Sequence, residues 1–251
     1  MPAKVYAVAN QKGGVGKTTT AVNVGACLAE AGERVLLIDL DPQANATSGL
    51  GVRANGTSTH DLLDGITLDA LARPTGVTNL DLVAAKSDLA AAAVELSQRA
   101  GGERYLAEAL ERGLDSYSFV FLDCPPSFGP LTVNALAAAN RALVPVQAEY
   151  YALEGLSQLL GTVNLVKSRL NPALEIAGIL LTMADGRTRL SADVEAELRR
   201  HFGELVLSTT VPRSVRLAEA PSHGLPAIAY DRRSTGAQAY WKVAMELVER
   251  S

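Results

Sequence analysis

The chain has 251 residues, of which 48% are hydrophobic and 20% are charged, an ordinary balance for a globular protein with a sizeable core. Its net charge of −4 excludes a surface coated in basic residues, and no apolar run approaches the ~18 residues that a membrane-spanning helix needs. The first residues enter a strand pattern at once, so we expect no signal peptide, and the two cysteines, Cys27 and Cys124, indicate reduced thiols in a cytoplasmic protein.

Apolar runs rich in β-formers alternate with helical patterns along nearly the full length of the chain. Strands are predicted at 5–9, 35–39, 80–84, 119–123, 142–147, 176–182 and 206–210. Helices are predicted at 18–31, 87–99, 103–113, 130–139, 153–169, 191–202 and 236–249, and the segment 43–79 is expected to be irregular with one short helix at 59–64. This alternation predicts an α/β fold with a mainly parallel twisted sheet flanked by helices on both faces, in a single domain over residues 1–251.

A glycine-rich turn follows the first predicted strand and precedes the first predicted helix. Such a turn cradles phosphates, because its backbone N–H groups and those of the first helical turn point at one anion. Its glycines close around the anion without Cβ clashes, Lys17 supplies a charge for the β- and γ-phosphates, and the Thr18 hydroxyl is placed to ligate Mg²⁺. A glycine turn can also be only a tight connection, but the flanking strand and amphipathic helix favour nucleotide binding. The residues expected to bind the nucleotide here are Lys12, Gly13, Gly14, Val15, Gly16, Lys17, Thr18 and Thr19.

One position of the turn departs from the usual phosphate-binding pattern. That pattern has glycine five positions before Gly16, where this chain has Gln11, and the turn contains a second lysine, Lys12. Loop lysines are usually exposed and solvated, so Lys12 is either an ordinary surface residue or has a task beyond the usual phosphate contacts.

Two apolar strands end in carboxylates. Asp39 ends one of them and Asp41 follows before Pro42, so both carboxylates project on the same side of an extended chain. Asp123 ends another strand, at the position where a Walker B carboxylate coordinates Mg²⁺, usually through water. Each aspartate alone could be a turn former or a helix cap. Together with the glycine turn they predict a phosphate and magnesium site at the carboxyl ends of the strands.

Several segments resemble motifs of the ParA/MinD family of ATPases. KGGVGKTTT from Lys12, DLDPQAN from Asp39 and FLDCPPS from Phe121 resemble its deviant Walker A, A′ and B motifs, and 145–155 and 211–222 are similar specifically to the ParA (Soj) branch. The resemblance covers about residues 3–240. It implies a P-loop NTPase fold, ATP and Mg²⁺ as cofactors, an ATP-dependent homodimer, non-specific binding of double-stranded DNA, and slow hydrolysis stimulated by a ParB-type centromere-binding protein. It also implies a cytoplasmic, nucleoid-associated protein, and we expect no N-terminal helix-turn-helix domain.

The same resemblance implies roles for individual residues. Lys17 neutralises the β- and γ-phosphates, Thr19 faces the α-phosphate, and Asp41 orients or activates the attacking water. Lys12 crosses a two-fold dimer interface and contacts the nucleotide of the other subunit, which makes ATP part of the interface. The catalytic residues implied are Lys12, Lys17 and Asp41, and those on the metal side are Thr18, Asp39 and Asp123, with Asp39 supporting either Mg²⁺ or the loop.

The adenine base and the DNA have less definite sites. The resemblance places the base against Met183, Pro212, Arg213 and Ser214. For DNA the candidates are Arg187, Arg189, Arg213 and Arg216, of which Arg189 and Arg216 are preferred, while Arg199, Arg200, Arg232 and Arg233 are weaker. Such contacts go to phosphates, so binding would be independent of sequence and sensitive to salt. An acidic protein can bind DNA in this way if dimerisation doubles a small basic patch.

A MinD-like membrane-cycling ATPase is the main alternative. Proteins of that type end in a basic amphipathic helix. The last predicted helix here carries charges of both signs on its polar face (Lys242, Glu246, Glu249 and Arg250). A mixed face suits a docked C-terminal helix better than an anionic bilayer, so we expect no membrane partner.

Two further functions share the glycine turn. An iron–sulfur reductase needs two cysteines per subunit to hold a cluster shared across a dimer, and the positions of Cys27 and Cys124 do not fit this need. A metabolic ligase or synthetase would need a further acidic or nucleophilic cluster for a small substrate, and the sequence indicates none.

Overall fold

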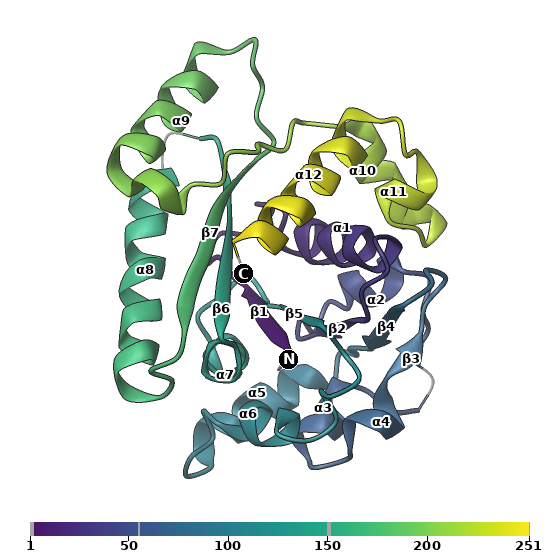
Figure 1. Cartoon of the computed structure of the whole chain (residues 1–251). Coiled ribbons are helices and arrows are strands. Elements are labelled where there is room, and N and C mark those ends of the chain that lie inside the picture. The colour runs from purple at the N-terminus through teal and green to yellow at the C-terminus, as the bar shows by residue number, and fades with distance from the viewer. Residues whose placement is uncertain (1–2, 55, 150–151, 251) are drawn as a thin grey trace.

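The computed structural model describes residues 3–54, 56–149 and 152–250, which form one seven-stranded sheet with helices on both faces (Figure 1). The strands lie in the order β3-β4-β2-β5-β1-β6-β7, and all neighbours are parallel except β3 and β4. Their bounds are β1 Lys4–Val8, β2 Val35–Asp39, β3 Arg73–Pro74, β4 Leu80–Val83, β5 Phe119–Asp123, β6 Arg141–Gln147 and β7 Glu175–Thr182. The predicted α/β fold is therefore confirmed.

The central strands bring the ends of distant segments together. Every residue of β2 and β5 is buried, which explains their continuously apolar sequences. The strand register places Asp39 of β2 opposite Asp123 of β5, and Asp123 opposite Val8 of β1. The two carboxylates and the start of the glycine turn therefore meet at one edge of the sheet.

Helices cover the two faces of this sheet in separate groups (Figure 1). One group consists of α1 (Lys17–Glu30), α2 (Asn45–Gly49), α10 (Val215–Glu219), the 3₁₀ turn η2 (Ala220–His223), α11 (Ala227–Tyr230) and α12 (Thr235–Glu249). The other consists of α3 (Thr59–Leu63), α4 (Leu68–Leu71), α5 (Leu89–Gln98), α6 (Tyr105–Leu110), α7 (Pro130–Ala138) and α8 (Ala152–Arg169), with α9 (Arg189–Phe202) and η1 (Gly203–Leu205) beside β7. Within the described ranges, no helix combines the length and the hydrophobicity that crossing a membrane requires.

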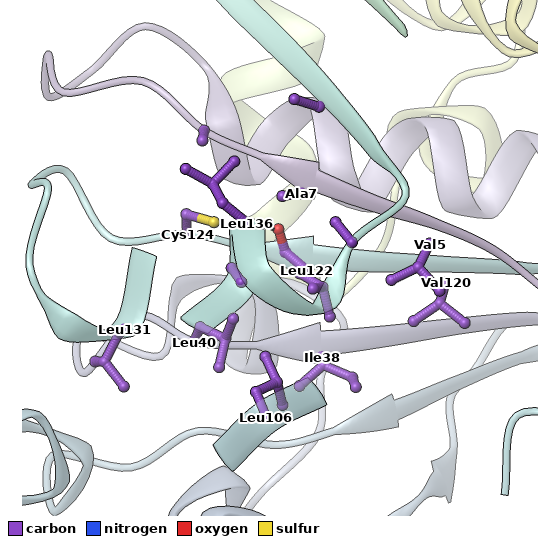
Figure 2. Close-up of a cluster of buried hydrophobic side chains, with 14 of the residues drawn as sticks. Val5, Ala7, Ile38, Leu40, Leu106, Val120, Leu122, Cys124, Leu131 and Leu136 are labelled. Carbon is purple, nitrogen blue, oxygen red and sulfur yellow. Dashed lines mark hydrogen bonds between the residues drawn. The ribbon is translucent and has the colours of Figure 1, made fainter. Parts of the chain in front are cut away.

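Each face of the sheet buries its own hydrophobic cluster. Alternate residues of a strand point to opposite faces, so Val5 and Ala7 of β1 enter one cluster and Tyr6 enters the other. Figure 2 shows the first cluster, in which residues of β1, β2 and β5 meet Leu106 of α6 and Leu136 of α7. In the second cluster the rings of Tyr6 and Phe121 stack with centroids 5.2 Å apart beneath α1 and α12.

The predicted strand at 206–210 is wrong. Only Val206 forms an isolated bridge, to Ile179 of β7. The N–H groups of Ser208 and Thr209 donate instead to the two carboxylate oxygens of Glu246 in α12, at 2.7 and 3.0 Å. Because a side chain takes these two donors, the regular strand pairing is interrupted at 208–209, and the chain rejoins the edge of β7 where the Val211 N–H donates to the Leu181 carbonyl oxygen at 2.8 Å.

The segment 43–79 is more regular than expected. It contains α2, α4 and β3 in addition to α3, which confirms the short helix predicted at 59–64. A capping box fixes the start of α3, since the Ser58 N–H donates to Asp61 at 2.6 Å and the Ser58 hydroxyl caps the helix. Helices α10 and α11 and the turn η2 also lie outside the predicted elements, because elements of four or five residues are too short to show a helical period.

Candidate nucleotide and magnesium site

The glycine turn runs from the end of β1 to Lys17, the first residue of α1. Gly14 and Gly16 have φ of 75° and 88°, a left-handed conformation that glycine adopts without strain. Gly16 caps α1, so the unpaired N–H groups of the first helical turn are directed at the turn. This backbone geometry suits an anion such as a phosphate chain.

Two polar side chains hold the turn in place. The Asn10 amide donates to the Pro145 carbonyl oxygen at 2.7 Å, and its own oxygen accepts from the Lys12 N–H at 3.0 Å. The Thr182 hydroxyl donates to the Val15 carbonyl oxygen at 2.8 Å. These bonds tie the turn to the ends of β6 and β7, so the cradle is preformed.

Lys17 is almost completely buried, and its Nζ donates to the Lys12 carbonyl oxygen at 3.1 Å. Burial lowers the pKa of Lys17, and the nearby Asp123, Cys124 and Asp41 partly offset this effect. A poorly solvated ammonium group is stabilised when an anion binds beside it. Lys17 is therefore placed to bind phosphate oxygens.

Asp123 is completely buried, and among the described residues neither of its carboxylate oxygens has a hydrogen-bond partner. Burial and then the neighbouring Asp39 raise the pKa of Asp123 well above its usual range, although the nearby Thr18 hydroxyl and Lys17 act in the opposite direction. Buried carboxylates are normally satisfied by hydrogen bonds, a cation or water. Carboxylate and hydroxyl oxygens are ligands that Mg²⁺ prefers, so Asp123 and Thr18 fit a magnesium ion.

Asp39 and Asp41 differ in their contacts. Asp39 is fully buried; one oxygen accepts from the Asp41 N–H at 3.1 Å, and the other accepts from the N–H and hydroxyl of Thr47 at 2.9 and 2.7 Å. Burial raises the pKa of Asp39 to about 6 despite these bonds. Since both oxygens are engaged within the chain, Asp39 fits the expected support of the loop better than direct coordination of a metal. Asp41, also buried, accepts from the Gln43 N–H at 2.9 Å and so shapes the turn that precedes α2.

Lys12 differs from Lys17 in that its charge is exposed and paired with a carboxylate. Its ammonium group forms an ion pair with Glu149, which lies just after β6, and the two side chains are 46% and 43% exposed. A surface pair of this kind is worth about 0–1 kcal/mol, so it exchanges readily for another partner.

A cavity of about 220 Å³ lies beside Gly16 and Thr19 of the turn. The four residues expected at the base, Met183, Pro212, Arg213 and Ser214, all line it, together with Thr182, Val211, Leu217, Ala218 and Tyr240. Hydrogen bonds from the Ala184 N–H to the Val211 carbonyl (3.0 Å) and from the Arg213 N–H to the Ala184 carbonyl (3.2 Å) join the two segments of the wall. A concave site with mostly apolar walls next to a phosphate cradle suits the base of a nucleotide.

Comparisons with known proteins agree with this geometry. A family model described as an AAA domain matches residues 3–176. The chain is 52% identical over 248 residues to the sporulation initiation inhibitor protein Soj of Bacillus subtilis, covering 97% of this chain and 98% of that protein. It is 56% identical over 244 residues to the chromosome-partitioning ATPase Soj of Thermus thermophilus, covering 97% and 95%. Among solved structures, the cobyrinic acid a,c-diamide synthase of Mycobacterium smegmatis with bound ADP and magnesium has a TM-score of 0.86 and 39% identity, covering 98% of this chain and 94% of the other.

The chain belongs to the Soj/ParA family of chromosome-partitioning ATPases. The resemblance seen in its Walker motifs is thereby confirmed, and so is its class as an ATPase.

The two cysteines of this Soj/ParA chain are not arranged as ligands of an iron–sulfur cluster. Cys27 and Cys124 are both buried, and they belong to the hydrophobic clusters on opposite faces of the sheet. Burial raises the pKa of Cys27 to about 12 and also raises that of Cys124. Neither thiol is in a position to share an exposed iron–sulfur cluster with a second subunit.

The C-terminal helix α12 is docked. Its apolar side lies in the cluster beneath α1, where Tyr240 forms a 3.0 Å hydrogen bond with Thr20, and Val243 and Leu247 are fully buried (Figure 1). Of the mixed charges noted in the sequence, Lys242, Glu249 and Arg250 are exposed on the outer side of this packed helix, whereas Glu246 is largely covered by the 208–209 segment.

The four main DNA candidates, of which the sequence favours Arg189 and Arg216, have unequal surroundings. Arg187 forms a double hydrogen bond with Asp185, at 2.9 Å for each contact, and Arg216 pairs with Glu219 at 2.7 Å and Asp231 at 3.4 Å. Arg189 is 94% exposed and has one long contact, 3.7 Å, to Asp193. Arg213 is exposed beside the cavity. Of the weaker candidates, Arg199, Arg200 and Arg232 are all engaged by glutamates.

Sequence reasoning missed several residues that shape the site. They are Asn10, Thr47, Glu149, Thr182 and Tyr240. The signal for Thr182 was available, because a polar residue at the carboxyl end of a predicted strand faces the ligand edge. Glu149 lies in the segment 145–155 that resembles the ParA branch, but no local signal gives the partners of Glu149 and Tyr240, which lie 137 and 220 residues away in the chain.

Proposed function

We propose that this partitioning ATPase is a nucleotide-dependent dimer switch. With ATP and Mg²⁺ bound it forms a homodimer on double-stranded DNA without sequence preference, and hydrolysis stimulated by a ParB-type protein releases it. The observation that carries the proposal is the contrast between two lysines of one turn. Lys17 is buried among carboxylates, whereas Lys12 is half exposed in a weak pair with Glu149 and is available to a second protomer.

The nucleotide would bind along the turn. Lys17 and the N–H groups of 13–19 would hold the β- and γ-phosphates, and Thr18 and Asp123 would hold Mg²⁺. When bound, Mg²⁺ would neutralise charge that develops on the phosphate oxygens. The adenine would occupy the cavity between Met183 and Pro212. Support comes from the Mycobacterium smegmatis structures, which contain ADP or an ATP analog with magnesium.

Asp41 would act on the attacking water. It lies beside the phosphate site at the end of β2, where the buried Asp39 accepts its N–H and so fixes the direction of the chain. A carboxylate held in this way can orient water toward the γ-phosphate in line with the leaving group.

A dimer would place Lys12 on the nucleotide of the partner protomer, so loss of the γ-phosphate would weaken the interface. Pairing two protomers would also double the patch formed by Arg187, Arg189, Arg213 and Arg216. A doubled patch supports DNA binding by a chain whose net charge is −4, because phosphate contacts depend on local rather than total charge.

An ATPase assay with and without DNA and the cognate ParB-type protein tests this function. We expect weak hydrolysis by the chain alone and stimulation when both partners are present. Lys17→Ala should abolish ATP binding, and Asp41→Ala should bind ATP but remain as a dimer on DNA. Hydrolysis by Asp41→Ala at the wild-type rate would refute the role given to Asp41.

The similar Mycobacterium smegmatis structures are named cobyrinic acid a,c-diamide synthase, which suggests a second function. The same ATPase assay can test it. Amidation with glutamine by covalent catalysis needs a reactive thiolate or a similar nucleophile, and both cysteines of this chain are buried with raised pKa values. Stimulation of ATP hydrolysis by cobyrinic acid with glutamine or ammonia, and not by DNA, would favour this second function.

A further inference from the structure

Helix α2 is fixed to the turn that carries Asp41. The Asp41 carbonyl oxygen accepts from the Ala44 N–H at 2.8 Å, and α2 begins at the next residue. Inside α2, Thr47 donates two hydrogen bonds to the buried Asp39. The start of α2 is therefore joined to the Asp41 turn, while Thr47 joins α2 to the end of β2, so we expect a displacement of the Asp41 turn to tilt α2 about Thr47.

The far end of α2 lies against η2, and the residues that follow the two elements, Gly51 and Gly224, touch through backbone atoms. A Cβ placed on Gly49 would lie 3.6 Å from the Pro221 side chain. Gly51, two residues after Gly49, lies against Gly224. A Cβ added to Gly224 would lie 2.8 Å from the Gly51 Cα, closer than real Cβ atoms approach. Gly51 and Gly224 have φ of 68° and 67°. No flexible side chain separates the two segments here, so movement of one is passed to the other.

The turn η2 continues directly from α10. The α10 segment carries two candidate DNA residues and also lines the proposed nucleotide site. Arg213 precedes α10 and Arg216 is part of it, while Ser214 and Leu217 line the 220 Å³ cavity. A small cavity of about 30 Å³ marks the place where α1, α2 and η2 meet, with Thr18 in its wall. The α10–η2 segment thus lines the base cavity, packs against α2 and borders the small cavity that Thr18 of α1 also lines.

We propose that the Gly51–Gly224 contact couples the phosphate site to Arg213 and Arg216 at the start of α10, so that the change at the Asp41 turn on loss of the γ-phosphate lowers DNA affinity. This inference rests on the proposed function, since it requires DNA binding through Arg213 and Arg216. Coupling between two sites is reciprocal, so DNA bound at α10 should in turn change the affinity for ATP.

Three alanine variants separate contact from backbone strain. Gly224→Ala should reduce the ratio of DNA affinity with a slowly hydrolysed ATP analogue to that with ADP by about tenfold, a usual size for coupling between sites. Gly51→Ala should have a smaller effect, since its Cβ would lie 3.3 Å from the Gly224 carbonyl oxygen. Gly32→Ala is the control, because Gly32 has φ of 100° but nothing within 4 Å of an added Cβ, and it should keep the wild-type ratio. Binding of the analogue without DNA should stay near wild type in all three.

A folded Gly224→Ala protein that keeps the wild-type ratio overturns the proposal, and if it does not fold, Gly51→Ala decides in its place. Hydrogen exchange of the unaltered protein gives an independent reading. Replacing ADP by the ATP analogue should slow exchange in 215–224, and unchanged exchange there also overturns the proposal. Failure of the unaltered protein to bind DNA with ATP would instead refute the proposed function, while the exchange measurement still reports on the contact.

Discussion

At the scale of single residues, the buried carboxylate of Asp123 destabilises the protein without a cation, and a bound cation would remove this cost. The carboxyl group is fully buried without a hydrogen-bond partner among the described residues, and its pKa is raised. The folded protein therefore binds this proton more tightly than the unfolded chain does. Its contribution to the free energy of unfolding is largest at low pH and declines as the pH rises through the raised pKa.

Asp123→Asn should stabilise the nucleotide-free protein and weaken its response to Mg²⁺ and ATP. The amide carries no charge, so we expect a gain of about 1–3 kcal/mol at alkaline pH, seen as a higher melting temperature that approaches the wild-type value as the pH falls. The increase in melting temperature on adding Mg²⁺ and ATP should shrink, because an amide is a poorer ligand. The exposed Asp115→Asn is the control. A lower melting temperature of Asp123→Asn at every pH would contradict this account.

Lys12→Ala should separate nucleotide binding from dimerisation. Its ion pair with Glu149 is a surface pair, so its loss should lower the free energy of unfolding by no more than about 1 kcal/mol. The melting temperature should therefore change little. Binding of ATP should persist through Lys17, while light scattering with ATP should detect monomers only. Lys86→Ala, which removes a comparable surface pair with Asp88, should leave the dimer intact. A Lys12→Ala dimer with ATP would show that Lys12 is an ordinary loop lysine.

At the scale of elements, the long helices and buried strands could be predicted because their periodicity is local. Helix α1 was expected at 18–31 and spans Lys17–Glu30, and β5 matches its prediction at 119–123. The failure at 206–210 has a tertiary cause, since the donors of Ser208 and Thr209 are taken by Glu246, 38 and 37 residues away. The Walker residues of the site were predictable from their motif, whereas Glu149 and Tyr240 reach it only through folding.

Glu246→Gln tests whether a side chain rather than the sheet holds this segment. Burial raises the pKa of Glu246, but the hydrogen bonds from Ser208 and Thr209 outweigh it and lower the pKa. The stabilisation is therefore present above the ordinary glutamate range and is lost as the pH falls through the lowered pKa. An amide has one acceptor oxygen, so we expect a loss of about 1–2 kcal/mol at neutral pH in denaturant unfolding. The difference from wild type should shrink in acid, and exposed Glu249→Gln should have no such effect.

At the scale of the whole molecule, charge is distributed unevenly along the chain. Residues 1–150 have a net charge of −5 and residues 151–251 a net charge of +1, and all four candidate DNA arginines belong to the second part. They lie in the segments around α9 and α10 that follow β7 (Figure 1). Arg187 and Arg216 are paired with carboxylates of the same chain, so we expect Arg189, which the sequence already preferred, and Arg213 to contact phosphates more readily than these two.

Arg189→Ala and Arg187→Ala provide a matched pair at the start of α9. Arg189 is almost fully exposed, so its removal should weaken binding to DNA of any sequence. The slope of log affinity against log salt should become shallower by about 0.9 for each DNA phosphate that is no longer neutralised, or by about 2 for a dimer. Arg187 is held by two hydrogen bonds to Asp185, so Arg187→Ala should change this slope little. Salt titrations of DNA affinity with the ATP analogue measure both slopes. A larger change for Arg187→Ala than for Arg189→Ala would mean that the Asp185 pair opens on DNA and that exposure alone does not select the phosphate ligands of this surface.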